Sequence, residues 1–370
     1  MTDFIVIGGG IAGVSAAACL APHGSVLLVE QESSLAYHTT GRSAATFITN
    51  YGSPGARSLA RASKSFLEKP PEGSVDAALL SPRGVIWAAR HDQKGDIEAV
   101  AEAGRTSGSH PEVLDADRIM EIMPLMDRAN LGGGIYEPTA RDVDVAGLHQ
   151  AFVRILRRHD GKIELNTPVT ALSRLDNGWT VTTPTGQFHA RKVINAAGAW
   201  GDVVATMAGI EPIGLQPLRR TAFMVPGSDD YAKYPMVVGI GNDYYFRPDG
   251  PQFLCSLSEE KPSEPCDPRP RMEDVALAID RINEISTLGI RSVNSQWTGL
   301  RTFAADREFV IGEEPTAPGF FWLVGQGGSG IMTSPGAGAL VASQVLGAPI
   351  PTELAAAGVD PEVVSPARFS

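Results

Sequence analysis

Residues 4–13 read Phe4-Ile5-Val6-Ile7-Gly8-Gly9-Gly10-Ile11-Ala12-Gly13, an apolar run that ends in a cluster of glycines. The β-branched and aromatic run predicts a strand that is buried on both faces. Gly8, Gly10 and Gly13 have the spacing G-x-G-x-x-G, and the small residues that follow them predict a helix. A helix that begins at such a turn offers free N–H groups and a positive dipole end to phosphates. The stretch therefore predicts a pyrophosphate-binding strand–turn–helix unit.

A second apolar run, Val26-Leu27-Leu28-Val29, predicts the next strand and ends at Glu30, 17 residues after Gly13. A carboxylate at this position can accept hydrogen bonds from ribose hydroxyls. The same charge disfavours a 2′-phosphate and so argues against NADP as the adenine-side ligand. The motif alone does not separate NAD from FAD.

Two further glycine clusters follow predicted strands. One strand over 193–197 ends at Ala197-Gly198, and another over 320–324 leads into a glycine turn over 325–330 and a helix over 334–346. The second of these repeats the order of strand, glycine turn and helix found at the N-terminus. It therefore predicts another helix N-terminus directed at the same ligand. Between the clusters we expect a helix over 145–158 capped by Asp144, and short strands over 163–165, 169–172, 179–183 and 187–190.

Composition excludes several classes of protein. The 370 residues are 43% hydrophobic and carry a net charge of −11, which argues against wholesale disorder and against nucleic-acid binding. No apolar run approaches the roughly 18 residues of a membrane span. The three cysteines and seven histidines are scattered, which predicts no metal site and no disulfide framework and favours a cytoplasmic protein.

With all three clusters placed, the sequence resembles the D-amino acid oxidase, glycine oxidase and sarcosine oxidase family of FAD enzymes. The resemblance rests on residues 6–13, on Val193-Ile194-Asn195-Ala196-Ala197-Gly198-Ala199-Trp200, and on the segment from Leu300 to Gly330. Within the family, it resembles bacterial FAD-dependent D-arginine dehydrogenases most, through stretches such as residues 41–45, 80–83 and 215–217.

The resemblance implies an α/β fold with a Rossmann-type FAD-binding domain and a discontinuous substrate domain built on a mixed or antiparallel sheet. We expect the FAD domain to comprise 1–50, 140–210 and 300–370, and the substrate domain to comprise 51–139 and 211–299. Prolines over 262–270 predict a loop in the substrate domain that could act as a mobile cover.

The implied cofactor is FAD, bound non-covalently, since no cysteine lies near Arg301–Asp306, where relatives with covalent flavin attach it. Hydroxyls, a glycine and an arginine over 39–46 can supply donors to the pyrophosphate, and Val169 is expected to meet the adenine end through its backbone. The residues predicted to bind FAD are Gly8, Gly10, Ala12, Gly13, Glu30, Gln31, Thr40, Gly41, Arg42, Ser43, Ala44, Ala45, Val169, Ala197, Gly198, Gly328, Ser329, Gly330 and Ile331.

The resemblance also selects the residues of a substrate site. Arg301, Arg220, Tyr245 and Tyr51 are predicted to be catalytic, since guanidiniums grip a carboxylate and phenols add directional hydrogen bonds. Arg219 is expected to point away from Arg220 because neighbours along a strand alternate. The predicted substrate pocket consists of Thr46, Ile48, Val85, Trp87 and Gly328.

One departure from the arginine dehydrogenases concerns the charge of this pocket. Val85 stands where they carry a glutamate that pairs with a cationic side chain, and Thr46 and Ile48 replace a histidine and a threonine. An unpaired buried cation is costly, so we expect D-arginine and D-lysine to be poor substrates. The alternative is that another acid, Glu259 or Asp243, replaces the missing glutamate.

The expected activity is oxidative deamination of a D-amino acid with a neutral or apolar side chain, with an electron acceptor that the sequence leaves unknown. No histidine falls in a matched active-site segment, so we expect hydride transfer without a protein general base. Three alternatives stay open: an oxidase of glycine, sarcosine or another secondary amine, a 2-hydroxy acid dehydrogenase, and a non-catalytic flavin-binding redox subunit.

Overall fold

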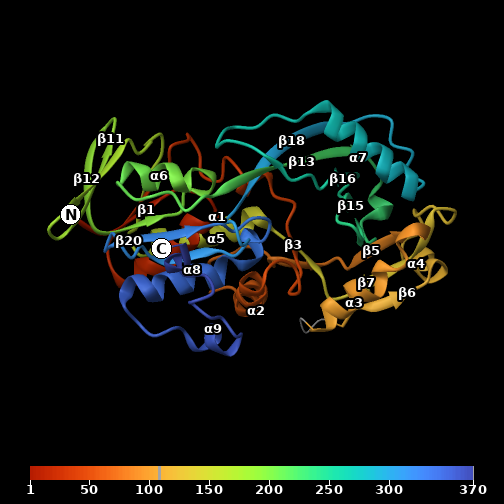
Figure 1. The fold of residues 1–370 in the computed structure, drawn as a ribbon, viewed down its shortest axis with the longest axis horizontal. Helices are drawn as coiled ribbons and strands as arrows, with labels where there is room; N and C mark the ends of the chain where they lie inside the picture. The colour runs from red at the N-terminus through yellow and green to blue at the C-terminus, as the bar shows by residue number, and fades with distance from the viewer. Residues whose placement is uncertain (107–109, 370) are drawn as a thin grey trace.

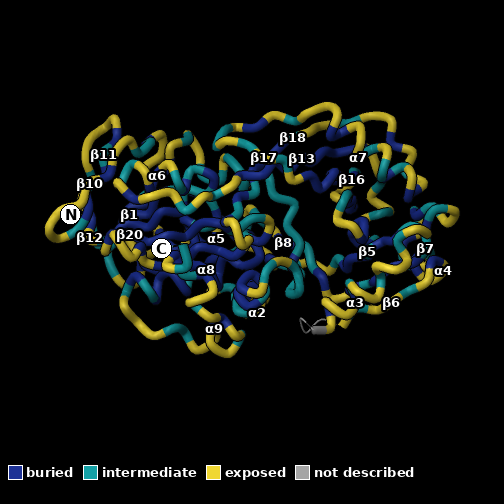
Figure 2. Tube along the Cα trace, viewed as in Figure 1, coloured by how far each residue is buried: buried dark blue, intermediate teal, exposed yellow. Residues whose placement is uncertain are grey.

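The computed structural model describes residues 1–106 and 110–369. Within them the chain forms two large sheets and a small third one, arranged in an elongated molecule (Figure 1). Both termini lie in the part that is built on the first sheet (Figure 1). Buried segments are concentrated in the middle of each of the two parts, and exposed segments form their margins (Figure 2).

The first sheet contains eight strands of the described chain, and its central order is β19-β20-β12-β1-β2-β9. Strands β1, β2, β9, β12 and β20 run parallel, while the β10–β11 hairpin extends the first half of β12. The strands are β1 (Thr2–Ile7), β2 (Val26–Val29), β9 (Lys162–Glu164), β10 (Ala171–Leu175), β11 (Gly178–Thr183), β12 (Gly186–Asn195), β19 (Val310–Glu313) and β20 (Phe320–Val324).

Alternation along β1 explains why both faces of this sheet are buried. Phe4 and Val6 pack under helices on one face, and Ile5 and Ile7 pack under the hairpin and α6 on the other. The helices of this part are α1 (Ile11–Leu20), α2 (Pro54–Glu68), α5 (Val145–Arg158), α6 (Gly201–Met207), α8 (Gly330–Leu346) and α9 (Thr352–Ala356).

The second sheet contains nine strands of the described chain and follows the path β17-β13-β16-β15-β14-β5-β7-β6, with β18 paired to β13. It is mixed, because β14 runs parallel to β5 while the other pairs are antiparallel. The strands are β5 (Val85–Arg90), β6 (Glu112–Leu114), β7 (Leu131–Glu137), β13 (Gln216–Pro226), β14 (Met236–Gly239), β15 (Tyr245–Asp249), β16 (Gln252–Ser256), β17 (Lys261–Pro262) and β18 (Ser295–Phe303).

The two faces of the second sheet have different surroundings. The outer face packs on α4 (Ala116–Ile122) and α7 (Met272–Ile285), whereas α3 (Asp96–Thr106) lies beside β6 and β7. The inner face carries a smaller apolar cluster that includes Val85 and Tyr245. A three-stranded sheet of β3 (Thr46–Phe47), β8 (Arg141–Val143) and β4 (Leu80–Pro82) joins the two parts (Figures 1 and 2).

The fold confirms the predicted class, and several element boundaries differ from the sequence prediction. The expected strands over 187–190 and 193–197 form the single strand β12, which pairs first with β11 and then with β20. Strand β10 begins at Ala171, because Val169 follows Pro168 in an irregular segment beside the cavity. Helix α8 begins at Gly330, four residues earlier than predicted, and accommodates Pro335 within its second turn.

The predicted domain ranges stay a prediction, and α2 is the element that fits them least well. Residues Leu59, Ala60 and Leu67 of α2 pack in the same apolar core as α1 and α8, although the sequence prediction assigns 51–139 to the substrate domain. The amphipathic pattern of α2 specified a helix but not which of the two cores its apolar face would join.

Candidate cofactor and substrate site

A large cavity opens at the carboxyl edge of the first sheet. Gly8 follows β1, Glu30 follows β2, Ala196 follows β12, and Gly325 follows β20, so that the turns after four parallel strands meet there. The carboxyl ends of parallel strands are where open α/β sheets bind their ligands. The second sheet covers the same cavity with Arg220, Ala222, Tyr245 and Arg301.

The turn after β1 is shaped for a group that approaches the backbone. Gly8 has φ +110°, and a Cβ there would lie 2.5 Å from the carbonyl oxygen of Ala196. A Cβ on Gly13 would overlap the carbonyl oxygen of Gly8, so α1 can pack this close to the turn only with glycine at that position. No side chain of the N-cap residue closes the start of α1 or of α8, and both starts line the cavity. Two helix N-termini in one cavity fit a pyrophosphate.

Glu30 and Thr40 support this turn. The Glu30 carboxylate is only 9% exposed and accepts hydrogen bonds from the backbone N–H groups of Gly9 at 2.6 Å and Glu32 at 2.9 Å. The Thr40 hydroxyl accepts one from the N–H of Ile11 at 2.9 Å. Both residues line the cavity, so they shape the turn and also face the place where a ribose and its phosphates would lie.

The structure brings most of the predicted FAD-binding residues to this one cavity. Those that line it are Gly8, Gly10, Ala12, Glu30, Gln31, Thr40, Arg42, Ser43, Ala44, Ala45, Val169, Ala197, Gly198, Gly328, Gly330 and Ile331. Gly13, Gly41 and Ser329 lie behind the lining; Gly13 and Gly41 permit close backbone packing there.

The side chain of Arg42 forms hydrogen bonds within the protein that the sequence did not indicate. Its guanidinium donates hydrogen bonds to Asp267 at 2.5 Å and to the carbonyl oxygen of Thr298 at 2.8 Å. Arg219 donates to the carbonyl oxygen of Arg269 in the same proline-rich loop. The loop over 262–270, which the sequence predicted as a possible mobile cover, is therefore tied to Arg42 of the cavity wall and to Arg219 of β13.

Three of the four predicted catalytic residues line the cavity directly, and the fourth adjoins it. Arg301, Arg220 and Tyr245 line it, while the Tyr51 phenol lies beside the Arg301 guanidinium. A Cβ on Gly328 would lie 3.0 Å from Arg301 Nη1 and 3.3 Å from Tyr51 Oη. Glycine at position 328 therefore leaves room in front of the guanidinium.

The two guanidiniums differ in their electrostatic setting. Burial, and then the charge of Arg301, lower the pKa of Arg220 to about 10. Burial also acts to lower the pKa of Arg301, but the Tyr51 and Tyr245 phenols and Glu260 outweigh it and the pKa is raised. Both groups are cationic at neutral pH, so the cavity is a place where an anion gains two buried positive partners.

Neighbouring groups fix the position of Arg220. Its Nε donates to the carbonyl oxygen of Glu259 at 2.9 Å, and its Nη2 lies 3.5 Å from the Glu260 carboxylate, which also pairs with Arg307 at 2.9 Å. As expected from strand alternation, Arg219 does not line the cavity. Arg220 is therefore held by its neighbours with its charge directed at the cavity.

Four of the five predicted pocket residues, all except Gly328, gather at the inner face of the second sheet. Val85 and Tyr245 belong to one buried apolar cluster, and Ile48 and Trp87 pack against it. Thr46 is half-buried, and its hydroxyl lies 3.6 Å from the sulfur of Met236. The structure thus groups these side chains beside Tyr245, although they do not line the main cavity.

A second, smaller cavity of about 150 Å³ lies next to this cluster, and sequence reasoning missed its acid. Tyr51, Trp87, Asn50 and Glu137 line it, and both Trp87 and Asn50 donate hydrogen bonds to the carboxylate of Glu137. Glu137 pairs with Val85 across β7 and β5, so the two side chains share a face of the sheet. Glu137 ends β7, for which the sequence predicted no strand, and its partner strand lies about fifty residues away in the sequence.

The two acids named as substitutes for the missing glutamate have other partners. Glu259 accepts a hydrogen bond from the N–H of Thr221 at 2.6 Å, and burial raises the pKa of its carboxyl group. Asp243 lies within 4.0 Å of both Arg90 and Arg281. Neither of them lines the main or the second cavity.

The remaining observations concern a histidine of the main cavity, metal binding and membrane spans. His38 lines the main cavity, with its Nε2 2.9 Å from Glu32 and its ring against Trp200. Over residues 1–106 and 110–369, no group of three or more His, Cys, Asp or Glu side chains is placed to hold a metal. In the same residues no helix has the length and apolar character that crossing a membrane requires.

Comparison with known proteins agrees with this geometry. A family model described as FAD dependent oxidoreductase, DAO, matches residues 3–344. Human mitochondrial dimethylglycine dehydrogenase is 30% identical over 219 residues, which are 56% of this chain and 24% of that protein. The chain therefore spans about a quarter of the length of the dimethylglycine dehydrogenases that it matches.

Two glycine oxidases match nearly the whole chain. That of Bacillus licheniformis is 24% identical over 365 residues, which are 95% of each sequence. The crystal structure of glycine oxidase from Geobacillus kaustophilus superposes with a TM-score of 0.84 at 22% identity, covering 94% of this chain and 95% of that one. The family model covers most of the chain, and the glycine turns and helix N-termini of the cavity fit the cofactor of that family. The chain therefore belongs to the DAO family of FAD-dependent oxidoreductases, and its cofactor is FAD.

Proposed function

We propose that this chain oxidises a D-amino acid with a neutral or apolar side chain, giving an imine that water hydrolyses to a 2-oxo acid and ammonia. The observation that carries the proposal is the pair of buried guanidiniums, Arg301 and Arg220, beside Tyr51 and Tyr245 in a cavity that also contains the two helix N-termini. Such a pair suits the carboxylate of an amino acid.

The residues have separate roles in this proposal. Arg301 is the main carboxylate anchor, because its tyrosine partners raise the pKa of its guanidinium and Gly328 leaves space in front of it. Arg220 adds a second positive charge, and Tyr245 shares its wall of the cavity. Bound FAD, held non-covalently, would accept the hydride that leaves Cα at flavin N5.

Positioning, rather than acid–base chemistry, is the main contribution of the protein. The amine must be neutral when hydride leaves, and its proton passes to water as the substrate binds. His38, which lines the cavity, is engaged with Glu32 and is assigned no role as a base. Holding Cα in a productive position is sufficient to lower the barrier by several kcal/mol.

The apolar cluster supports a preference for uncharged side chains. Val85, Ile48 and Tyr245 offer no carboxylate to a cation, and Glu137, which pairs with Val85 across the strands, lines the second cavity. The Glu137 carboxylate, across the strand pair from Val85, shares its cavity with Arg57, so an ammonium or guanidinium side chain there would meet a like charge. D-Arginine and D-lysine are expected to be poor substrates.

The test mixes the purified holoenzyme with each substrate under anaerobic conditions. Reduction of the flavin is monitored by the bleaching of its absorption band. The panel contains neutral D- and L-amino acids, D-arginine, glycine, sarcosine, dimethylglycine and 2-hydroxy acids. Bleaching by neutral D-amino acids but not by D-arginine supports the proposal. Rapid bleaching by D-arginine contradicts the argument from Val85, and bleaching only by sarcosine or a 2-hydroxy acid replaces the proposed substrate class.

Two further measurements complete the proposal. Acid precipitation should release the flavin, as expected for non-covalent FAD. Reoxidation in air with peroxide detection separates an oxidase from a dehydrogenase; slow reoxidation is expected, in line with the dehydrogenases that the sequence resembles. We also propose that the protein is cytoplasmic. Its cysteines, Cys19, Cys255 and Cys266, are all free, as is usual in a reducing compartment.

A further inference from the structure

Glu137 is a buried acid to which the proposed reaction gives no role. Glu137 is 6% exposed. Its Oε1 accepts hydrogen bonds from Trp87 Nε1 at 2.9 Å and from Asn50 Nδ2 at 3.1 Å. Both donors are neutral. Among the ion pairs of residues 1–106 and 110–369, none involves this carboxylate, although buried charges are ordinarily paired.

A positive charge from another element lines the same cavity as Glu137. Arg57, in the first turns of α2, lines the same cavity, and within the described chain its guanidinium has no hydrogen bond or ion pair. The cavity thus holds a group that only accepts hydrogen bonds and a group that only donates them. Their charges cancel, so the space between them favours a neutral occupant that can both donate and accept.

Tyr51 lies near both cavities, although it lines only the second. Tyr51 lines the second cavity, while its hydroxyl contacts Arg301 of the main one. Trp87 also lines the second cavity and packs against the cluster that contains Tyr245. A side chain that reaches the second cavity from a carboxylate anchored at Arg301 would therefore pass beside Tyr51.

We propose that the second cavity is a side-chain subsite that binds a carboxamide, its NH₂ donating to Glu137 and its C=O accepting from Arg57. The inference rests on the proposed function and deepens it: the substrate class becomes D-amino acids with an amide-terminated side chain, of which D-glutamine is the simplest example of adequate reach. An ammonium side chain would meet the charge of Arg57, and a carboxylate would meet that of Glu137, so neither satisfies both walls.

The first experiment measures binding without turnover. 4-Carbamoylbutanoate has the carboxylate and carboxamide of D-glutamine but no α-amine, so it cannot be oxidised. 5-Methylhexanoate is its apolar isostere. Isothermal titration calorimetry of the holoenzyme should show that the amide binds about tenfold to a hundredfold more tightly, as expected for a hydrogen bond to a charged group.

Two variants test the two walls separately. Glu137→Gln keeps an acceptor for Trp87 and Asn50 but removes the charge, and it should abolish the preference for the amide while leaving the affinity for 5-methylhexanoate within about twofold. Arg57→Leu, at a half-exposed position that tolerates change, should reduce the preference without lowering the yield of folded protein. The matched control is Glu112→Gln, an exposed acid on β6, which should keep the full preference.

The possible results separate this inference from the proposed function. Equal affinity for the two acids in the unmodified protein overturns the inference, even if neutral D-amino acids bleach the flavin. A preference for the amide that survives in both variants overturns it as well. If the preference depends on Glu137 but no D-amino acid reduces the flavin, the result supports the amide subsite and contradicts the proposed reaction.

Discussion

Individual residues set the charge of this site, and its two arginines hold their protons differently. Burial and the neighbouring Arg301 lower the pKa of Arg220 to about 10, whereas the surroundings of Arg301 raise its pKa. Arg220 is thus the cation that is lost first as pH rises. A bound carboxylate favours the charged form, so binding and protonation of Arg220 are linked.

This linkage predicts how affinity depends on pH. The affinity for 4-carbamoylbutanoate, which has no amine to titrate, should be constant from pH 7 to 9 and fall as pH rises through about 10. Each further pH unit should then weaken binding by up to about tenfold. Titration calorimetry across this range provides the measurement. In Arg220→Gln the affinity should be lower throughout, and the decline near pH 10 should be absent; an unchanged decline would assign it to another group.

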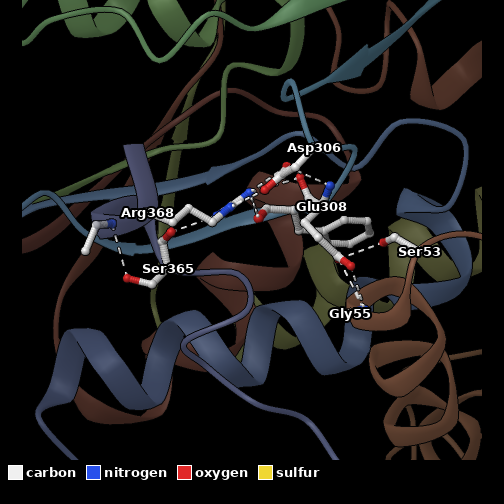
Figure 3. A network of polar contacts seen from close by, with 8 residues as sticks. Ser53, Gly55, Asp306, Glu308, Ser365 and Arg368 are labelled. Carbon is white, nitrogen blue, oxygen red and sulfur yellow. Dashed lines mark hydrogen bonds and ion pairs between the residues drawn. The ribbon is translucent and has the colours of Figure 1, made fainter. Parts of the chain in front are cut away.

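At the scale of elements, the N-terminus of α2 connects the site to the C-terminal segment (Figure 3). The carboxylate of Glu308 accepts hydrogen bonds from the Ser53 hydroxyl at 2.7 Å and from the N–H of Gly55 at 3.1 Å. Arg368 pairs with Asp306 at 2.7 Å and donates to the backbone carbonyl of Glu308. Figure 3 shows these side chains directed toward one another between α2 and the end of the chain. The start of α2 follows Tyr51 directly, so this network also positions the tyrosine.

Replacing Glu308 should therefore affect stability and substrate binding together. Glu308→Gln removes a charge from a helix N-terminus and should cost about 1–2 kcal/mol of unfolding free energy. Because Tyr51 shifts with the helix start, KM should rise several-fold with a smaller change in kcat. Denaturant unfolding and steady-state kinetics measure the two effects. Glu211→Gln, at an exposed position outside any helix, is the control and should change neither; a loss of stability without a change in KM would separate α2 from the site.

Sequence was most informative where local pattern decides the structure. The strand, glycine turn and helix over residues 2–20 follow from apolar runs and glycine spacing, and Asp144 caps α5 as predicted. Arg301 and Arg220 could be selected only through resemblance, because nothing local distinguishes them from surface arginines. Glu137 escaped prediction because its position depends on the register between β5 and β7, which the chain sets through pairing at long range.

At the scale of the whole molecule, the main cavity lies between the two sheets. The first sheet supplies the glycine turns, and the second supplies Arg220, Tyr245 and Arg301. Each sheet has its own apolar core, and the small sheet of β3, β8 and β4 joins them. A cofactor that fills this cavity contacts both parts, so its binding free energy contributes to the stability of the folded chain as a unit.

Removing FAD should therefore destabilise both parts of the molecule. With free FAD at 100 times its dissociation constant, the linkage relation predicts about 2.7 kcal/mol of added stability, which is lost in the apoprotein. Calorimetry should show one transition for the holoenzyme, and a lower, broader or divided transition for the apoprotein, because the two cores then lose the group that both contact. Gly13→Ala, which places a Cβ against Gly8, should reproduce the apoprotein result even with excess FAD. A transition that does not depend on FAD concentration would mean that the cofactor contributes nothing to folding, and would leave the direct contacts between the two sheets as the sole coupling of their cores.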